Sequence, residues 1–168
     1  PFCAPFPVIF YAHGYGGSRA EITLHMGRHN AMGYAMCSLD SYGHGLSRWF
    51  SAPDETAGFD LALGRFGQLG VRELGSLMIA GRDRDLNNDG KPDSGMDMWT
   101  NDVFHTRDMV RQAAVDWMWL ARSFHECGEG QWTTWDGETG TTCDWDGDGV
   151  ADMGGQDARL FIVGGSLG

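Results

Sequence analysis

The sequence has few cysteines, few basic residues and no long apolar run, and each shortage excludes a class of protein. Four cysteines among 168 residues are too few for a small fold built on disulfides. Twelve basic against 23 acidic residues give a net charge of −11, which repels phosphate, so we expect no nucleic-acid partner. Because no apolar stretch is long enough to cross a membrane, we also expect no transmembrane segment.

What is present suits one globular domain, because the hydrophobic content is 42%. The chain starts without Met or a signal peptide and stops inside a motif, so we expect residues 1–168 to be an incomplete domain from a longer protein. Cys127 and Cys143 bracket a loop rich in Gly, Thr and Trp and make a plausible disulfide. Such a bridge indicates an oxidising compartment.

Two apolar runs are each followed by a glycine-rich motif. Residues 7–12 predict a strand buried on both faces, as in a parallel sheet, and His-Gly-x-Gly-Gly follows at 13–17. Ser18 and Glu21 then form a capping-box pattern, which predicts a helix that ends at Gly33. A second strand is predicted over 34–39, before Asp-x-x-Gly-His-Gly-x-Ser at 40–47. Strand, helix and strand make one βαβ unit with its loops at the carboxyl ends of the strands.

A third apolar run, residues 160–163, precedes Gly-x-Ser-x-Gly at 164–168. The three motifs, in this order and each after a strand, resemble the α/β-hydrolase superfamily, in particular secreted bacterial lipase- or esterase-like serine hydrolases. The resemblance covers residues 7–48 and 101–168. It implies a partial α/β-hydrolase fold, with a mostly parallel sheet flanked by helices.

This resemblance implies the roles of three catalytic residues. Ser166 is the nucleophile, held in a strained turn that ends a buried strand, and side chains at Gly164 or Gly168 would crowd that turn. The backbone N–H groups of Tyr15 and Leu167 are the oxyanion donors. The expected activity is cleavage of small-molecule or lipid carboxylic esters. A peptidase of the same fold and a non-catalytic calcium-binding extracellular module remain as alternatives.

His13 and His44 are assigned structural rather than catalytic roles. In this fold the acid and the histidine of the triad follow the serine, whereas every histidine here precedes Ser166. We therefore expect both partners to lie beyond residue 168, and the chain alone to be inactive. His13 is expected to hold its loop, and His44 and Asp40 to brace the neighbouring turn.

Residues 49–100 interrupt the βαβ pattern and predict a cap-like insertion over the substrate site, with an ordinary packed insertion as the alternative. Asn101 or Asp102 then caps a long amphipathic helix. Its sheet-facing residues are predicted to be Val103, Val110, Ala114, Trp117, Ala121 and Phe124.

Two segments place oxygen ligands at alternate positions before a glycine, as in the front half of a calcium loop. The predicted ligands are Asp85, Asn87, Asp89, Lys91 and Asp93 in the first loop, and Asp144, Asp146, Asp148, Val150 and Asp152 in the second. Lys91 and Val150 would donate backbone carbonyls. Neither loop has Glu at position 12, so these are not EF-hands; they resemble the shorter calcium loops of dockerin and thrombospondin repeats.

We expect two structural Ca²⁺ ions, neither of them catalytic, with solvated acidic turns as the alternative. The second loop should lie at the amino-terminal edge of the sheet, and the first should brace the cap. Together with the resemblance, these features indicate a secreted, extracellular or periplasmic bacterial protein.

Overall fold

The computed structural model describes residues 2–46, 81–85, 87–90, 92–96, 98–134, 137–166 and 168. Most of the predicted cap-like insertion therefore lies outside the described residues, as do Lys91 and Leu167. The chain divides into two compact units. The first comprises Pro1–Tyr11, Ile22–Cys37 and Val115–Val163, and the second comprises Ala12–Glu21, Ser38–Ala114 and Gly164–Gly168.

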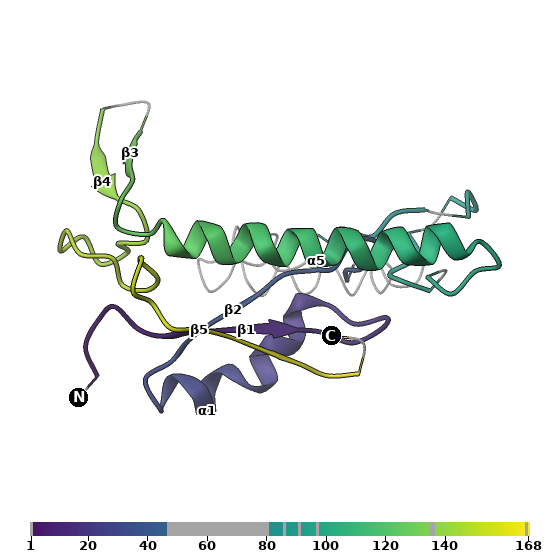
Figure 1. Ribbon diagram of the computed structural model, residues 1–168, viewed down its shortest axis with the longest axis horizontal. Helices are drawn as coiled ribbons and strands as arrows, with labels where there is room; N and C mark the ends of the chain where they lie inside the picture. Colours follow the sequence, from purple (N-terminus) through teal and green to yellow (C-terminus); the bar gives the residue numbers. More distant parts are fainter. Residues whose placement is uncertain are drawn as a thin grey trace, which may run out of the picture. The chain divides into compact units, whose positions relative to one another are not determined.

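A small parallel sheet joins three strands, β1 (Val8–Ala12), β2 (Ala35–Ser38) and β5 (Leu160–Gly164), in the order β2-β1-β5 (Figure 1). The central strand β1 is the most buried, with Val8, Ile9, Phe10 and Ala12 in the core. Helices flank the sheet, so the arrangement is α/β. The three strands predicted from apolar runs are confirmed.

The burial predicted for the third strand is wrong. Phe161, Ile162 and Val163 of β5 are 43%, 61% and 43% exposed. Successive side chains of a strand point to opposite faces, so both faces of β5 are open at these residues. β5 is also an edge strand, with β1 as its only neighbour among the described strands of this sheet. Apolar composition predicted a strand here but could not show that the strand lies at the edge.

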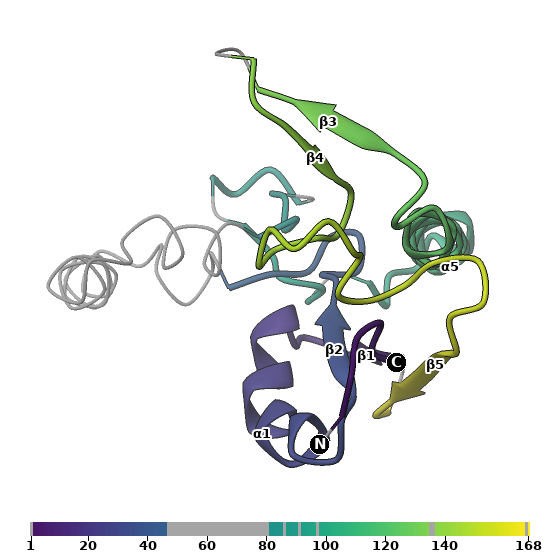
Figure 2. The ribbon, with the colours of Figure 1, turned by 90° about the vertical axis from the view of Figure 1, so that its left-hand side faces the viewer.

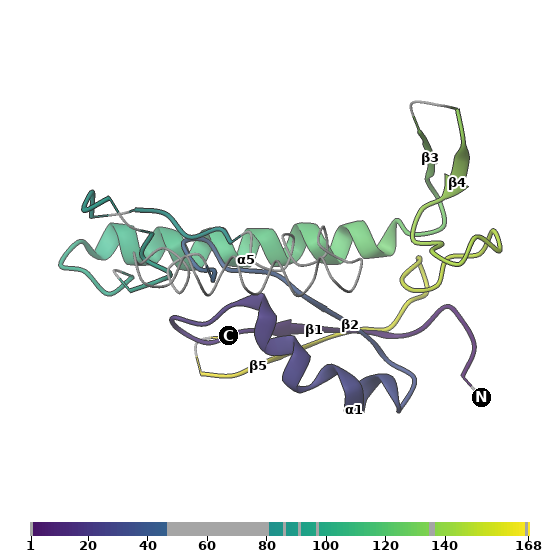
Figure 3. The ribbon, with the colours of Figure 1, turned by 180° about the vertical axis from the view of Figure 1, so that it is seen from behind.

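The helix predicted after Ser18 is divided into two short segments, a 3₁₀ helix η1 (Arg19–Leu24) and α1 (Met26–Asn30) (Figure 3). The Ser18 hydroxyl accepts a hydrogen bond from the N–H of Ala20 at 3.3 Å, so the helical segment begins where predicted. Neither segment contains a buried residue, and without a packed face a continuous α-helix gains little stability. Gly33 ends the segment with φ +82°.

The long helix α5 (Val103–His125) begins at Asp102, whose carboxylate accepts hydrogen bonds from the N–H groups of Phe104 and His105. Part of its predicted packing face is correct, because Trp117 and Phe124 place their rings 5.9 and 5.2 Å from the ring of Phe10.

The amino-terminal part of that face is wrong. Val103 and Val110 are 69% and 47% exposed and Ala114 is also exposed, whereas Met109 is 3% exposed. The inward stripe starts at Met109 and continues through Ala113 to Trp117 at four-residue spacing. Adjacent apolar residues made both stripes compatible with the sequence.

The predicted Cys127–Cys143 disulfide is confirmed, with the two Cα atoms 5.4 Å apart. Between the two cysteines lies a hairpin of β3 (Gln131–Thr133) and β4 (Thr139–Thr141), which are antiparallel (Figure 2). The sequence separation of the two cysteines is 16. A bridge of this span restricts the unfolded chain and so raises the free energy of unfolding by about 3 kcal/mol.

Candidate active site

The turn that follows β5 holds Ser166 in an uncommon backbone conformation. Its φ is +61°, in the left-handed region that non-glycine residues enter only at a cost of roughly 1–3 kcal/mol. The N–H of Gly165 donates to the carbonyl of Ala12 at 3.3 Å, and the N–H of Gly168 donates to the carbonyl of Gly165 at 3.1 Å. Gly165 and Gly168 are therefore held in a closed turn at the end of β1.

The two motif glycines of this turn are sterically required. A Cβ added to Gly164 would lie 2.1 Å from the carbonyl carbon of Gly168. A Cβ on Gly168 would lie 2.2 and 2.5 Å from the carbonyl oxygens of Ala12 and His13. A Cβ on Gly165, one of the two variable positions of the motif, would meet no atom within 4 Å. The crowding predicted from the motif is confirmed.

The His-Gly loop after β1 lies beside this turn. A Cβ built on Gly14 would be 3.2 Å from the Cβ of Ser166 and 3.8 Å from its Oγ. The N–H of Gly17 donates to the carbonyl of Gly14 at 3.0 Å, which closes the loop. Among the described residues the backbone N–H of Tyr15 has no hydrogen-bond acceptor, so it is free to bind a ligand oxygen. The structure thus brings Tyr15 and Ser166 into one region, while Leu167 lies outside the described residues.

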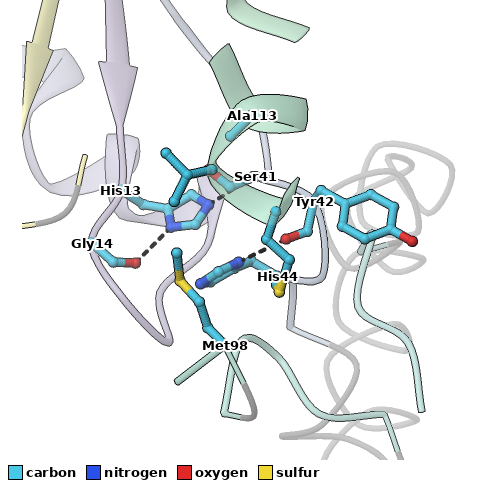
Figure 4. Close-up of a pocket in the computed structure, with 9 residues that line it drawn as sticks. His13, Gly14, Ser41, Tyr42, His44, Met98 and Ala113 are labelled. Atoms are coloured by element: carbon cyan, nitrogen blue, oxygen red, sulfur yellow. Dashed lines mark hydrogen bonds between the residues drawn. The ribbon is translucent and has the colours of Figure 1, made fainter. Parts of the chain in front are cut away.

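His13 ties two loops together rather than facing solvent. It is 2% exposed, its Nε2 accepts from the N–H of Ser41 at 3.0 Å, and its Nδ1 lies 2.8 Å from the carbonyl of Gly14 (Figure 4). Because a carbonyl can only accept, Nδ1 carries the proton and donates, and the imidazole is neutral. With both nitrogens engaged, His13 has the loop-holding role expected for it.

Asp40 braces the loop after β2. Its carboxylate is 1% exposed, accepts from the N–H of Arg19 at 2.6 Å and lies 3.3 Å from the Arg19 guanidinium. Burial raises the pKa of Asp40 above its usual range, against the lowering effect of the Arg19 hydrogen bond and charge. Arg82 adds a hydrogen bond to the Asp40 carbonyl at 3.1 Å, so Asp40 stabilises the turn, as expected.

His44 has one ring nitrogen engaged and one unpaired. Nδ1 lies 3.1 Å from the Tyr42 carbonyl and therefore donates to it. Nε2 is buried and has no hydrogen-bond partner in the described part of the chain. Burial is the main cause that lowers the pKa of His44, which keeps the ring neutral near pH 7 and leaves Nε2 as an acceptor.

The described end of the predicted insertion lies against these loops. The N–H of Gly95 donates to the carbonyl of Gly43, and the Tyr15 hydroxyl donates to the carbonyl of Met96 at 2.9 Å. The rings of Tyr15 and Trp99 lie 6.3 Å apart. These contacts place Gly95, Met96 and Trp99 next to the candidate site.

The two aspartate loops form the same local hydrogen bonds at two points, and in both the N–H of the fifth residue donates to the side chain of the third. In each, the first aspartate accepts a hydrogen bond from the glycine five positions later, at 2.7 Å between Gly90 and Asp85 and at 2.9 Å between Gly149 and Asp144. The second loop lies at the amino-terminal edge of the sheet, as predicted, because the N–H of Phe6 donates to the carbonyl of Asp152 at 2.8 Å.

The loops differ in how their carboxylates gather. Ligand oxygens of Asp144, Asp146 and Asp152 lie within 4.8 Å of one another, the one such acidic group in the described ranges, while Asp148 is outside it and accepts from the N–H of Val150. In the first loop an amide nitrogen lies between two carboxylates. Nδ2 of Asn87 donates to carboxylate oxygens of Asp89 and Asp93, at 3.3 and 3.2 Å. The donor set of the second loop therefore fits a hard divalent cation better.

The Ser166 hydroxyl has no hydrogen bond to a histidine or carboxylate within the described ranges.

Comparisons with known proteins add no relative, because no family model, no curated protein and no solved structure matches the chain.

Proposed function

We propose that the chain carries the nucleophile and the oxyanion hole of a serine hydrolase that cleaves carboxylic esters, of lipase or esterase type, on an α/β-hydrolase fold. The observation that carries the proposal is the proximity of Gly14 to Ser166, which stands at positive φ in a crowded turn. A nucleophilic hydroxyl beside an unpaired backbone N–H is the arrangement that acyl transfer requires.

The proposed chemistry follows from these groups. Ser166 Oγ attacks the ester carbonyl and forms a tetrahedral intermediate, whose oxyanion accepts hydrogen bonds from the N–H groups of Tyr15 and Leu167. Each such donor contributes about 3 kcal/mol to the transition state. His13 cannot take the serine proton because both its nitrogens are engaged. Because the Ser166 hydroxyl has no hydrogen bond to a histidine or carboxylate within the described ranges, proton transfer is assigned to groups outside them.

A fluorophosphonate probe tests the nucleophile when imidazole is added as an external base. We expect a phosphonyl adduct on Ser166, located by tandem mass spectrometry, at a rate that rises with imidazole concentration. Ser166→Ala should remove it. Labelling that survives Ser166→Ala, or that spreads evenly over the other serines, contradicts the proposal.

A matched pair of variants tests the oxyanion donor. Tyr15→Pro removes the backbone N–H and should slow labelling about 100-fold, the lower range for losing one donor. Tyr15→Phe keeps that N–H and removes only the hydroxyl that contacts Met96. We expect it to label close to the wild-type rate. Equal losses in the two variants would exclude the assigned donor.

We further propose that the second aspartate loop binds a structural Ca²⁺ through carboxylates that include Asp144, Asp146 and Asp152. The closeness of their oxygens supports this, since unscreened carboxylates at such separations repel each other. Terbium tests it, because Trp145, between two of these ligands, can sensitise its emission. Asp146→Asn should weaken terbium binding at least about ten-fold, whereas Asp157→Asn, outside the loop, should not.

A secreted, extracellular or periplasmic bacterial location completes the proposal. The Cys127–Cys143 disulfide supports it, because disulfides persist in oxidising compartments. The structure has no helix among its described residues that is long and apolar enough to cross a membrane.

A further inference from the structure

A small cavity lies next to the His-Gly loop in the second unit. Its volume is about 80 Å³, and its walls include His13, Gly14, His44, Met98, Met109 and Ala113 (Figure 4). The apolar walls come from two segments, the stretch around Met98 and the amino-terminal half of α5. Gly14 borders both the cavity and Ser166, so the cavity lies close to the candidate nucleophile.

The two histidines in its wall have different hydrogen-bonding states. His13 has a partner on each nitrogen, and the N–H of Ser41, which also lines the cavity, is one of these partners. His44 is 2% exposed and donates through Nδ1 to the Tyr42 carbonyl, while its Nε2 has no partner among the described residues. A buried acceptor without a donor is unfavourable, because it has lost its hydrogen bonds to water. An occupant that supplies a donor would recover that free energy.

The size and lining of the cavity limit the occupant. One water needs roughly 10–15 Å³ of such volume, and an engineered cavity of about 150 Å³ holds benzene. The present cavity therefore suits about three to five non-hydrogen atoms. Nε2 of His44 is covered on one side by Gly95, where an added Cβ would lie 2.2 Å from it. Figure 4 shows Met98 beside the same ring, and the flexible Met98 thioether can move to admit a group that reaches Nε2.

We infer that this cavity is a binding subsite for a small alkyl group that bears a hydroxyl. The O–H donates to His44 Nε2, and the carbon atoms pack against Met98, Met109 and Ala113. Taken as part of a substrate site, the inference rests on the proposed function and names the substrate class, an ester with a short hydroxylated substituent. Binding itself does not depend on hydrolysis.

Isopropanol and acetone form a matched pair of probes, because they share one heavy-atom skeleton and only isopropanol donates a hydrogen bond. Titrations are followed by the ¹⁵N resonance of His44 Nε2 and by the methyl resonance of Met98. We expect saturable shifts with isopropanol and binding about five-fold tighter than that of acetone, the factor given by one neutral hydrogen bond.

Two variants separate the acceptor from the cavity, both read from the Met98 methyl. His44→Asn keeps an amide donor for the Tyr42 carbonyl but removes Nε2, so isopropanol and acetone should bind equally. Ala113→Leu fills the cavity and should abolish binding of both. Ala114→Leu, its exposed neighbour on α5, should leave binding unchanged.

The inference is overturned if acetone binds the wild type as tightly as isopropanol. It is also overturned if the preference survives His44→Asn, or if Ala113→Leu and Ala114→Leu have equal effects. None of these readouts uses Ser166, so a failure here is distinct from a failure of fluorophosphonate labelling, which would reject the hydrolase and leave the subsite standing.

Discussion

The glycines of the turn after β5 allow a sharp test, because the same added methyl group should impair labelling at one position and have no effect at the adjacent one. In Gly164→Ala the new Cβ would lie 2.1 Å from the carbonyl carbon of Gly168, whereas ordinary contacts begin at 3.4 Å. That carbon belongs to the backbone, so the turn must open by about 1 Å. A misplacement of about 1 Å at a reacting group can cost about 100-fold in rate.

We expect Gly164→Ala to slow imidazole-assisted labelling of Ser166 by about that factor. Gly165→Ala meets no atom within 4 Å and should label near the wild-type rate. Circular dichroism during thermal unfolding reports whether each variant keeps its fold. A wild-type rate in Gly164→Ala, or equal losses in the two folded variants, would refute the crowded turn as the cause of the glycine pattern.

Three further predictions concern the surroundings of the site. Burial lowers the pKa of His44 below its ordinary value of 6.5. As pH falls through 6.5, the unfolded chain therefore binds a proton at this residue that the folded chain does not. Urea titrations should show that the free energy of unfolding decreases as pH falls through this range. The raised pKa of Asp40 has the opposite effect on the free energy of unfolding as pH falls. The contribution of His44 is therefore the part of the pH dependence that disappears in His44→Asn. Gly14→Ala places a Cβ 3.1 Å from a backbone oxygen, which requires a shift of a few tenths of an ångström, and should reduce labelling several-fold. Replacing Cys127 and Cys143 with serine should lower the free energy of unfolding by about 3 kcal/mol in urea titrations.

Features that depend on neighbouring residues could be predicted from the sequence. The three strands follow from continuous apolar runs, and the start of α5 follows from Asp102 before an amphipathic stretch. The spacing of Cys127 and Cys143 around a glycine-rich loop indicated their bridge. The steric role of Gly164 was predictable because it depends on a contact only four residues away.

Features that depend on assembly could not be predicted. The exposure of β5 depends on its place in the strand order, and the choice between Met109 and Val110 depends on how α5 is rotated. The two aspartate loops have nearly the same pattern, yet Asn87 replaces an acid with a donor and changes how the carboxylates gather. No pattern in the residues of β5 indicates that the strand is exposed. The replacement of an aspartate by Asn87, in contrast, can be seen by aligning the two loop sequences.

His13 and His44 differ in how many of their ring nitrogens are hydrogen-bonded, and this difference connects the two glycine-rich motifs to the candidate site. Both histidines follow a strand and precede a glycine, and their rings lie 5.1 Å apart. His13 uses both nitrogens on backbone groups, which makes it a structural tie between the loops after β1 and β2. His44 uses only one, which leaves an acceptor at a cavity that Gly14 also borders. A purely structural histidine gains nothing from an unpaired buried nitrogen, so the asymmetry favours a ligand-facing role for His44.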